Sequence, residues 1–495
     1  MTSMQIDPIL LLGILITGLG LLIYLFNESI KKPVIAYFLI QLTVIWIFFG
    51  QKTLGPMGLE IKPHAVVFLL TTLVSFYFIF KHFDYLWSYK PFRYLFFFFI
   101  ISTIYAIFYK TDFRSSSYID LWIHNNLGLK HSAIKSGLGT ISREFGSSET
   151  KYIVYLAGLA PLIAFVAGFM SFKSGGLKPT LQNLISFFSF TSLTYLIFLG
   201  ISILAGTSTL MFIQGRLAID GGFTGNDFEA LLLIMLVGFY LYIQKNRDFK
   251  LYEPTKWSII TNIIILSLLI LLGIKKGTIL SLFIATHVVI GLIFAVKLYY
   301  KEKIGFNFNP AFLLAPIFLI VLPTIFCPEF AETTLYNIQD RFASTDTIDI
   351  RMVNWELYNQ YWAGNFDFFK ALFGFGIDSS REATFFLTAM HPEPSMQQPH
   401  IHSIYLEMFY NYGLIALLFF LPFILILFGN FKDILHNKYN IFNCLSVTII
   451  LFFLVYYITE SPAVPSIIVI FSLLGFLESI RRALSEHQKE NPVYN

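Results

Sequence analysis

The chain has 495 residues, of which 56% are hydrophobic and only 13% are charged, and its formal net charge is +4. An ordinary soluble domain is roughly 45–50% apolar and about 25% charged. The composition therefore excludes a soluble globular protein and predicts a membrane protein, and no nucleic-acid partner is expected.

Apolar runs long enough to cross a hydrocarbon core of roughly 30 Å recur along the chain and predict about thirteen membrane-spanning helices. They fall near residues 8–26, 33–50, 65–80, 93–109, 152–171, 182–204, 229–244, 258–274, 279–298, 310–327, 411–429, 441–458 and 464–480. The first run lacks a basic flank and a cleavage site, so we expect a retained helix. The predicted fold class is an all-α polytopic integral membrane protein in which residues 1–495 form one membrane domain.

Lysine and arginine concentrate in alternate connecting segments, while the short segments between them hold few. Because cytoplasmic loops carry the excess of basic residues, the pattern predicts an outward amino terminus and a cytoplasmic carboxyl terminus. Two long segments, 110–151 and 328–402, then face outward. The second lies between spans 10 and 11 and is too aromatic for disorder, so we expect short helices on the membrane surface.

Two outward segments precede spans and carry basic residues. In "QGRLAIDGGFTGNDFEALL", Arg216 is followed by several glycines and by Asn226, which suits the cap of the next helix. A simpler interpretation is that the glycines only turn the chain. In "GIKKGTILSLF", Lys275 and Lys276 stand in a short outward turn, against the positive-inside trend.

The large outward loop contains "TIDIRMVNWELYNQYWAGN", in which Arg351, Trp355, Tyr358 and Trp362 recur on one helical face. One interpretation is a helix that rests on the membrane while its arginine snorkels to the headgroups. The other is that Arg351 offers its planar fork of donors to a phosphate.

Farther along, "LFGFGIDS" predicts a tight turn at Gly374 and Gly376. In "PHIHSIYLEMFYNYGLIALLFF", a helix would place His402 and Gly413 on one face, with Gly413 leaving room for a neighbouring helix or a lipid chain. A structural alternative is that His402 only caps this helix or forms a hydrogen bond with a loop.

The basic residues Arg216, Lys275, Lys276 and Arg351, together with His402, converge on the predicted outer face, where an anionic ligand would explain them together. The sequence contains no paired metal ligands on a span, no nucleophile elbow and no glycine-rich phosphate loop. We therefore expect neither a metal nor a cofactor.

These pieces resemble a known family. Arg351 with Trp355, the "FGFG" turn and "HSIYLEMFYNYGLI" are similar to the signature of the O-antigen polymerase and O-antigen ligase superfamily, and "GRLAIDGGFTGNDFEALLL" is similar to its arginine, glycine and asparagine segment. The motifs cover roughly residues 214–428, and the first five spans carry none. The resemblance implies a metal-independent glycosyltransferase of the bacterial inner membrane, similar to the membrane glycosyltransferase C class, with residues 328–402 forming part of the active site.

The resemblance also implies roles for single residues. Arg216 and Arg351 would hold the diphosphate of an undecaprenyl-diphosphate-linked oligosaccharide, and Lys276 would replace the serine and arginine that many members have before the ninth span. Arg351 and His402 would be catalytic, where the histidine suits either a general base or a phosphate contact.

Trp355 and Gly413 would support the site. The expected reaction joins a growing lipid-linked polysaccharide to the hydroxyl of a new lipid-linked repeat unit on the periplasmic face. The expected partners are this donor, membrane lipid and a co-polymerase that regulates chain length. A ligase that passes the polysaccharide to a lipid A core shares these motifs. A transporter or flippase of the same lipid-linked sugar is an alternative of another class, although paired halves are not evident.

Overall fold

The computed structural model describes residues 8–49, 63–108, 158–173, 177–204, 210–213, 216–219, 222–223, 227–246, 249, 251–273, 275–302, 351–352, 355–356, 359, 367–376, 403–438, 440–458, 460 and 464–490. Most of these residues are helical. The helices are α1 (Pro8–Lys31), α2 (Val34–Phe49), α3 (Pro63–Lys81), α4 (Phe83–Trp87), α5 (Lys90–Phe108), α9 (Leu159–Phe169), α10 (Leu177–Leu204), α11 (Asp227–Lys245), α12 (Glu253–Gly273), α13 (Lys276–Tyr299), α17 (Phe368–Phe373), α19 (Ile404–Tyr412), the 3-10 helix η3 (Gly413–Ala416), α20 (Leu417–Leu435), α21 (Ile441–Tyr456) and α22 (Val464–Glu490).

The helices are consistent with a helical membrane protein. Every predicted span except 310–327, which lies outside the described residues, falls on one of them. Four segments are long and apolar enough to cross a membrane, namely Asp227–Lys245, Glu253–Gly273, Lys276–Tyr299 and Ile404–Leu435. The count of thirteen spans and their orientation stay predictions. The two long loops, 110–151 and 328–402, lie almost wholly outside the described residues.

A small antiparallel sheet interrupts the helices between α10 and α11. Its strands β1 (Leu210–Ile213), β2 (Arg216–Ile219) and β3 (Gly222–Phe223) follow one another in the order β1-β2-β3. Ile213 pairs with Arg216 and Ile219 with Gly222, so each hairpin turns over two residues that include a glycine. The all-α prediction thus holds for the bundle, with this sheet added where the sequence analysis expected only turns.

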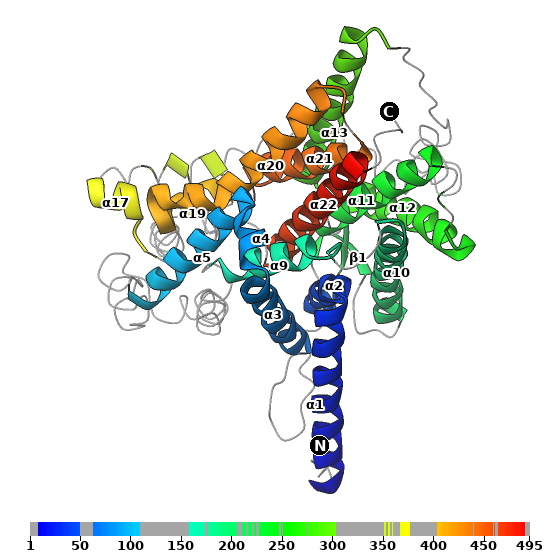
Figure 1. Ribbon diagram of the computed structural model, residues 1–495, viewed down its shortest axis with the longest axis vertical. Coiled ribbons are helices and arrows are strands. Elements are labelled where there is room, and N and C mark those ends of the chain that lie inside the picture. The colour runs from blue at the N-terminus through cyan, green and yellow to red at the C-terminus, as the bar shows by residue number, and fades with distance from the viewer. Residues whose placement is uncertain are drawn as a thin grey trace.

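Helix α22 forms the centre of the bundle. Every residue from Ser466 to Ile480 is buried, as expected of a helix that is apolar on all sides. It packs along α9 and also touches α2, α11 and α21 (Figure 1). Gly168 of α9 lies against the backbone of Ser472, and Gly475 of α22 lies against the backbone of Phe165. These two glycines allow the helices to approach closely, which is a common way of packing helices in membranes.

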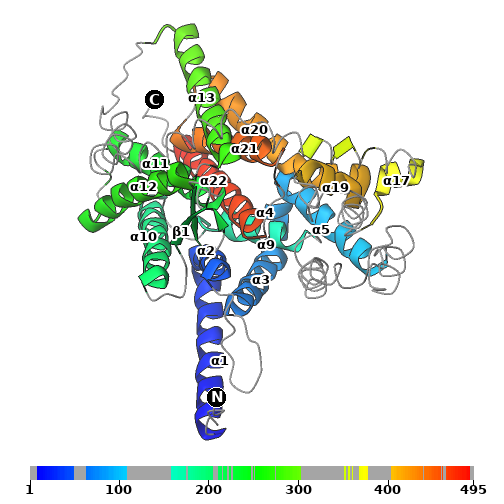
Figure 2. The same ribbon diagram turned by 180° about the vertical axis from the view of Figure 1, so that it is seen from behind.

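Both ribbon views show α1 projecting away from the remaining helices, whereas α19 and α17 lie on one side of the bundle (Figures 1 and 2). Helix α22 extends from one end of the bundle to the opposite end. Its first residue, Val464, follows the end of α21, and its residue Arg482 lies about 27 Å farther on at 1.5 Å per residue. These two ends carry the polar groups described below.

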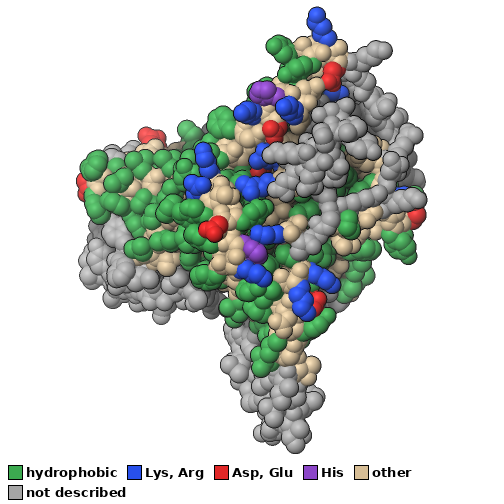
Figure 3. Space-filling model, viewed as in Figure 1, with side chains coloured by type: hydrophobic (Ala, Val, Ile, Leu, Met, Phe, Trp, Pro, Cys, Tyr) green, Lys and Arg blue, Asp and Glu red, His purple; other side chains and the backbone are tan. Residues whose placement is uncertain are grey.

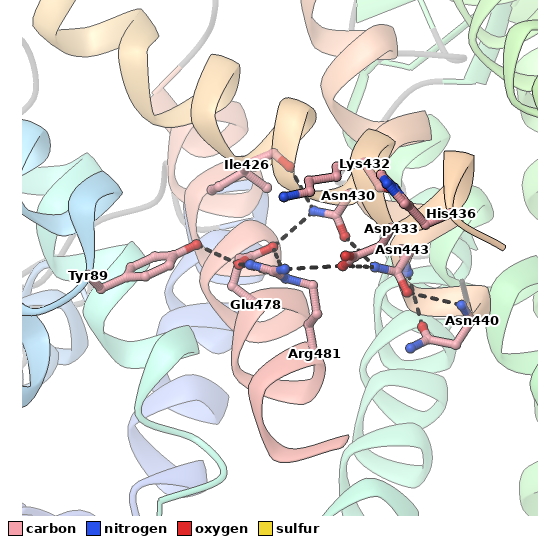
Figure 4. A network of polar contacts seen from close by, with 10 residues as sticks. All are labelled: Tyr89, Ile426, Asn430, Lys432, Asp433, His436, Asn440, Asn443, Glu478 and Arg481. Atoms are coloured by element: carbon pink, nitrogen blue, oxygen red, sulfur yellow. Dashed lines mark hydrogen bonds and ion pairs between the residues drawn. The ribbon is translucent and has the colours of Figure 1, made fainter. Parts of the chain in front are cut away.

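A buried polar network joins α20, α21 and α22 to Tyr89, the residue just before α5, toward the carboxyl end of α22 (Figure 4). The Glu478 carboxylate is fully buried and accepts hydrogen bonds from the Tyr89 hydroxyl at 2.5 Å, the Asn430 amide at 3.0 Å and the Arg481 guanidinium at 2.8 Å. Asn443 donates to Asn430 at 2.9 Å. The buried polar groups of this network hydrogen-bond one another, which fixes how α20, α21 and α22 pack together and against Tyr89.

Candidate functional site

The first element of the site is an ion pair between Arg351 and Glu460. The Arg351 Nη2 atom lies 3.0 Å from the Glu460 Oε1 atom, and the two side chains are only 14% and 18% exposed. The Arg351 Nε atom is buried and has no hydrogen-bond partner in the part of the chain that the structure describes. Glu460 therefore fixes the guanidinium while leaving a donor that is not used.

A second cation lies beside the same residues. The Lys275 ammonium donates a hydrogen bond to the Tyr456 hydroxyl and lies 5.1 Å from the centre of that ring. Tyr456 is also within electrostatic reach of Arg351 and Glu460. Among the residues that the structure describes, Lys275 forms no ion pair with an acid. Its place before the first residue of α13 adds positive charge to a helix amino terminus, which already favours anions.

The start of α19 is attached to the same end of α21. The Ile404 amide donates to the Tyr457 carbonyl at 3.2 Å, and the Tyr405 hydroxyl donates to the Leu454 carbonyl at 2.7 Å. The Tyr457 hydroxyl in turn bonds the Asp227 carboxylate at the start of α11. We use the name Arg351 cluster for Arg351, Glu460, Lys275, Tyr456 and the α19 start at Ser403.

His402 itself lies outside the described residues, but its neighbour Ser403 is buried and precedes the first residue of α19. Three segments that are far apart in the sequence, around residues 275, 351 and 403, therefore meet at the end of α21.

The other predicted site residues have different positions. Lys276 is the first residue of α13, next to Lys275. Arg216 lies in β2, which packs against α12, and its side chain is not described. Trp355 is helical and half-buried, as is Arg351, and Glu356 is helical and exposed, which agrees with the predicted helix at this point in the loop.

The expected placement of Gly413 is wrong. Helix α19 runs from Ile404 to Tyr412, and Gly413, whose φ of 58° is left-handed, follows it, so Gly413 lies at a break and not on the face of one continuous helix. A Cβ on Gly413 would lie 2.5 Å from the Ala371 carbonyl oxygen and 2.5 Å from the Gly374 nitrogen. The room left by Gly413 is filled by the backbone of the last turn of α17 and of Gly374, not by a lipid or another spanning helix.

Glu460, Tyr456 and Asp227 were missed by the sequence analysis. Glu460 stands in "YYITESP", directly after a predicted span. An acidic residue at the boundary of a span could have been recognised as a candidate site residue. Neither tyrosine in this segment has a pattern that separates it from the many other aromatic residues of the chain. Their role follows only from contacts between segments that are distant in the sequence.

The Arg351 cluster can bind and stabilise an anion. Among the described residues, its arginine has a buried donor that is not used and its lysine has no acidic partner, and neighbouring side chains fix both. Within the described ranges, no group of three or more histidine, cysteine or acidic side chains is placed to hold a metal ion.

The class of protein that the fold and this site define is a helical membrane protein with a cationic cluster at one end of its bundle. No protein-family model matches the chain, and no curated protein sequence matches it significantly.

Proposed function

We propose that the chain is a metal-independent glycosyltransferase that polymerises lipid-linked oligosaccharide repeat units. It would transfer a glycan from undecaprenyl diphosphate to the hydroxyl of an acceptor repeat unit on the periplasmic face of the inner membrane. The observation that supports this most is the meeting of Arg351, Lys275 and the segment that follows His402 at the end of α21.

Glycosyl transfer from a diphosphate donor depends most on positive charges that are held in fixed positions. When the bond between the anomeric carbon and the diphosphate breaks, the leaving group is an anion, and preorganised positive charge lowers the energy of that transition state. The planar guanidinium of an arginine can make two parallel hydrogen bonds to phosphate oxygens, which is the role proposed for Arg351. Lys275 would act on the same group as a point charge.

The acceptor hydroxyl must lose its proton as it attacks the anomeric carbon. In this proposal His402 receives that proton, because an imidazole with a pKa near 6.5 suits a general base at neutral pH. The hydrogen bond from the Ile404 amide to the Tyr457 carbonyl holds the start of α19 at the end of α21, close to where Lys275 and Arg351 contact Tyr456 and Glu460. This supports the proposal that base and cations act on one donor.

The decisive experiment supplies purified protein with the lipid-linked repeat unit of its own organism and separates the products by size. A ladder of lipid-linked polymers supports the polymerase, and transfer only to added lipid A core assigns a ligase instead. Lys275→Gln is expected to lower the rate at least tenfold. Lys297→Gln, which removes a lysine from the opposite end of the same helix, is the matched control. Uptake of the lipid-linked sugar without any new glycosidic bond would overturn the enzyme assignment in favour of a transporter.

A further inference from the structure

A second cationic cluster lies at the other end of α22, where α3, α4, α5 and α9 also end or begin. Figure 3 shows lysine, arginine and histidine side chains gathered on this face of the molecule, between hydrophobic regions and with few acidic side chains among them. We use the name Tyr85 site for Tyr85, Lys173, Arg482 and His82 with the ring of Tyr89. The proposed glycosyl transfer makes no use of it.

Two consecutive arginines of α22 have different surroundings. Arg481 forms ion pairs with Glu478 at 2.8 Å and Asp433 at 3.2 Å, as Figure 4 shows. Arg482 lies instead over aromatic rings, 4.4 Å from the centre of Tyr89 and 5.6 Å from that of Tyr85. Because Arg481 and the rest of the polar network occupy Glu478, Arg482 has no acidic partner among the described residues.

Lys173 completes the pair of cations on Tyr85. Its ammonium lies 4.1 Å from the centre of the Tyr85 ring and 3.1 Å from the Nδ1 atom of His82. In the part of the chain that the structure describes, Lys173 forms no ion pair, and Asp84 on α4 pairs with neither Lys173 nor Arg482. Burial, followed by the charges of Lys173 and Lys81, lowers the pKa of His82. Burial, followed by Lys81, also lowers the pKa of Lys173.

The aromatic floor of the site is held rigidly. The Tyr89 hydroxyl is anchored by the buried Glu478 carboxylate, and the Tyr89 ring stacks on Phe169 with 4.8 Å between ring centres. The Tyr85 ring also lies against Phe169, at 5.8 Å. Arginine and lysine above such rings gain from cation–π attraction but keep their hydrogen-bond donors for another partner.

We propose that the Tyr85 site binds the phosphate of an anionic phospholipid headgroup. Arg482 would donate two hydrogen bonds to the phosphate oxygens and Lys173 would add a point charge. A lipid fits better than a free phosphate because apolar side chains border the site: Phe80 and Phe83, on either side of His82, are 79% and 38% exposed. Tyrosine and tryptophan at the ends of apolar helices are also typical of the headgroup level of a bilayer, and basic residues there attract anionic lipids.

The test uses the full-length protein in detergent with defined lipids, and counts bound lipid molecules by native mass spectrometry. Phosphatidylglycerol and phosphatidylcholine are titrated separately, and inorganic phosphate is added as a competitor in a third arm. The variant is Lys173→Gln with Arg482→Gln. The matched control is Lys432→Gln with Lys438→Gln, which removes two positive charges near the end of α20. Thermal unfolding of each variant reports whether the bundle is intact.

We expect at least a fivefold weaker affinity for phosphatidylglycerol in the Tyr85-site variant, with little change in the control and weak binding of phosphatidylcholine throughout. Arg482→Lys, which keeps the charge but loses the planar fork, should retain part of the affinity. This milder variant still tests the proposal if the double variant unfolds. Equal losses in variant and control would overturn the proposal, because they would indicate only general surface charge. Displacement of the lipid by millimolar inorganic phosphate, with the same dependence on Arg482, would assign the site to free phosphate and overturn the lipid assignment.

Discussion

Gly374 and Gly413 pack backbone against backbone. A Cβ on Gly374 would lie 2.6 Å from the Gly413 nitrogen, and a Cβ on Gly413 would lie 2.5 Å from the Gly374 nitrogen. Both residues have left-handed φ angles, 74° and 58°. The Phe375 amide donates to the Tyr410 carbonyl at 2.8 Å and the Gly376 amide to the Asn411 carbonyl at 3.3 Å. The "FGFG" turn is thereby locked to the end of α19, whose other end lies in the Arg351 cluster.

Gly413→Ala should destabilise the protein and weaken its activity. A side chain at a left-handed residue costs about 1–2 kcal/mol, and the clash with the Ala371 and Gly374 backbone adds to this cost. Thermal unfolding in detergent measures the effect. Gly291→Ala on α13 is the control, because nothing lies within 4 Å of its Cβ position and alanine favours a helix. A Gly413→Ala protein as stable as this control would contradict the packing.

The sequence predicted the turn at Gly374 and Gly376 because glycine pairs mark positions where other residues are strained. It gave the wrong role to Gly413, because an uninterrupted apolar run hides a break in the helix. The periodic pattern from His402 to Gly413 assumes a continuous helix, whereas the left-handed Gly413 ends α19 and starts a 3-10 turn. Local pattern cannot reveal that another stretch of backbone occupies the space beside a glycine.

Composition alone sufficed to predict a helical membrane protein, since apolar runs and scarce charges leave few other folds. The sequence singled out Lys275 because its charge in an outward turn opposes the usual trend, and Arg351 because it shares a helical face with aromatic residues. The residues that contact these two cations, Glu460 and Tyr456, were not predicted. The contact between Arg351 and Glu460 joins residues 109 apart, and no local pattern encodes a pairing across such a distance.

The Arg351–Glu460 pair gives the sharpest test of the site. Arg351→Lys should reduce glycosyl transfer by tenfold or more although the charge is kept, because lysine lacks the planar fork. Glu460→Gln should also reduce transfer, since the amide no longer holds the guanidinium by its charge. Product formation from lipid-linked donor is the measurement, and protein yield in the membrane is the control for insertion. Near-normal polymer from the Arg351→Lys enzyme would refute the diphosphate role.

Glu478→Ala should lower the free energy of unfolding by about 2–3 kcal/mol. Removing one partner of a buried ion pair typically costs about 3–5 kcal/mol, and the lower range applies because Arg481 is 28% exposed and keeps Asp433. Glu253→Ala breaks an exposed pair with Lys256, where about 0–1 kcal/mol is expected. Denaturant unfolding of both variants in detergent gives the comparison. Equal stabilities would mean that the network in Figure 4 does not hold α20, α21 and α22 together.

The predicted orientation can be tested with cysteines placed at Ser116 and Ser380, one in each long segment expected to face outward. Cys327 and Cys444 are the only native cysteines and are replaced by serine first. Both new thiols should react with a membrane-impermeant reagent in intact spheroplasts, and a cysteine at Ser485, near the carboxyl terminus, should react only after lysis. The reverse pattern would place the Arg351 cluster on the cytoplasmic side.

Substitutions at His402 separate its three interpretations. As a general base it acts on the acceptor, so His402→Ala should stop transfer but leave donor binding nearly unchanged. As a phosphate contact, the same change should weaken donor binding, and His402→Arg should restore part of it. As a helix cap or loop contact, it should be replaceable by glutamine with almost normal activity.

Donor binding and product formation are measured for all three variants, with His436→Gln at the exposed end of α20 as the control for loss of a histidine. The bond from Ile404 to Tyr457 uses main-chain atoms only, so the start of α19 should remain in place in each variant. Since an amide cannot take up a proton at neutral pH, a fully active His402→Gln enzyme would exclude the catalytic role and assign His402 a structural one.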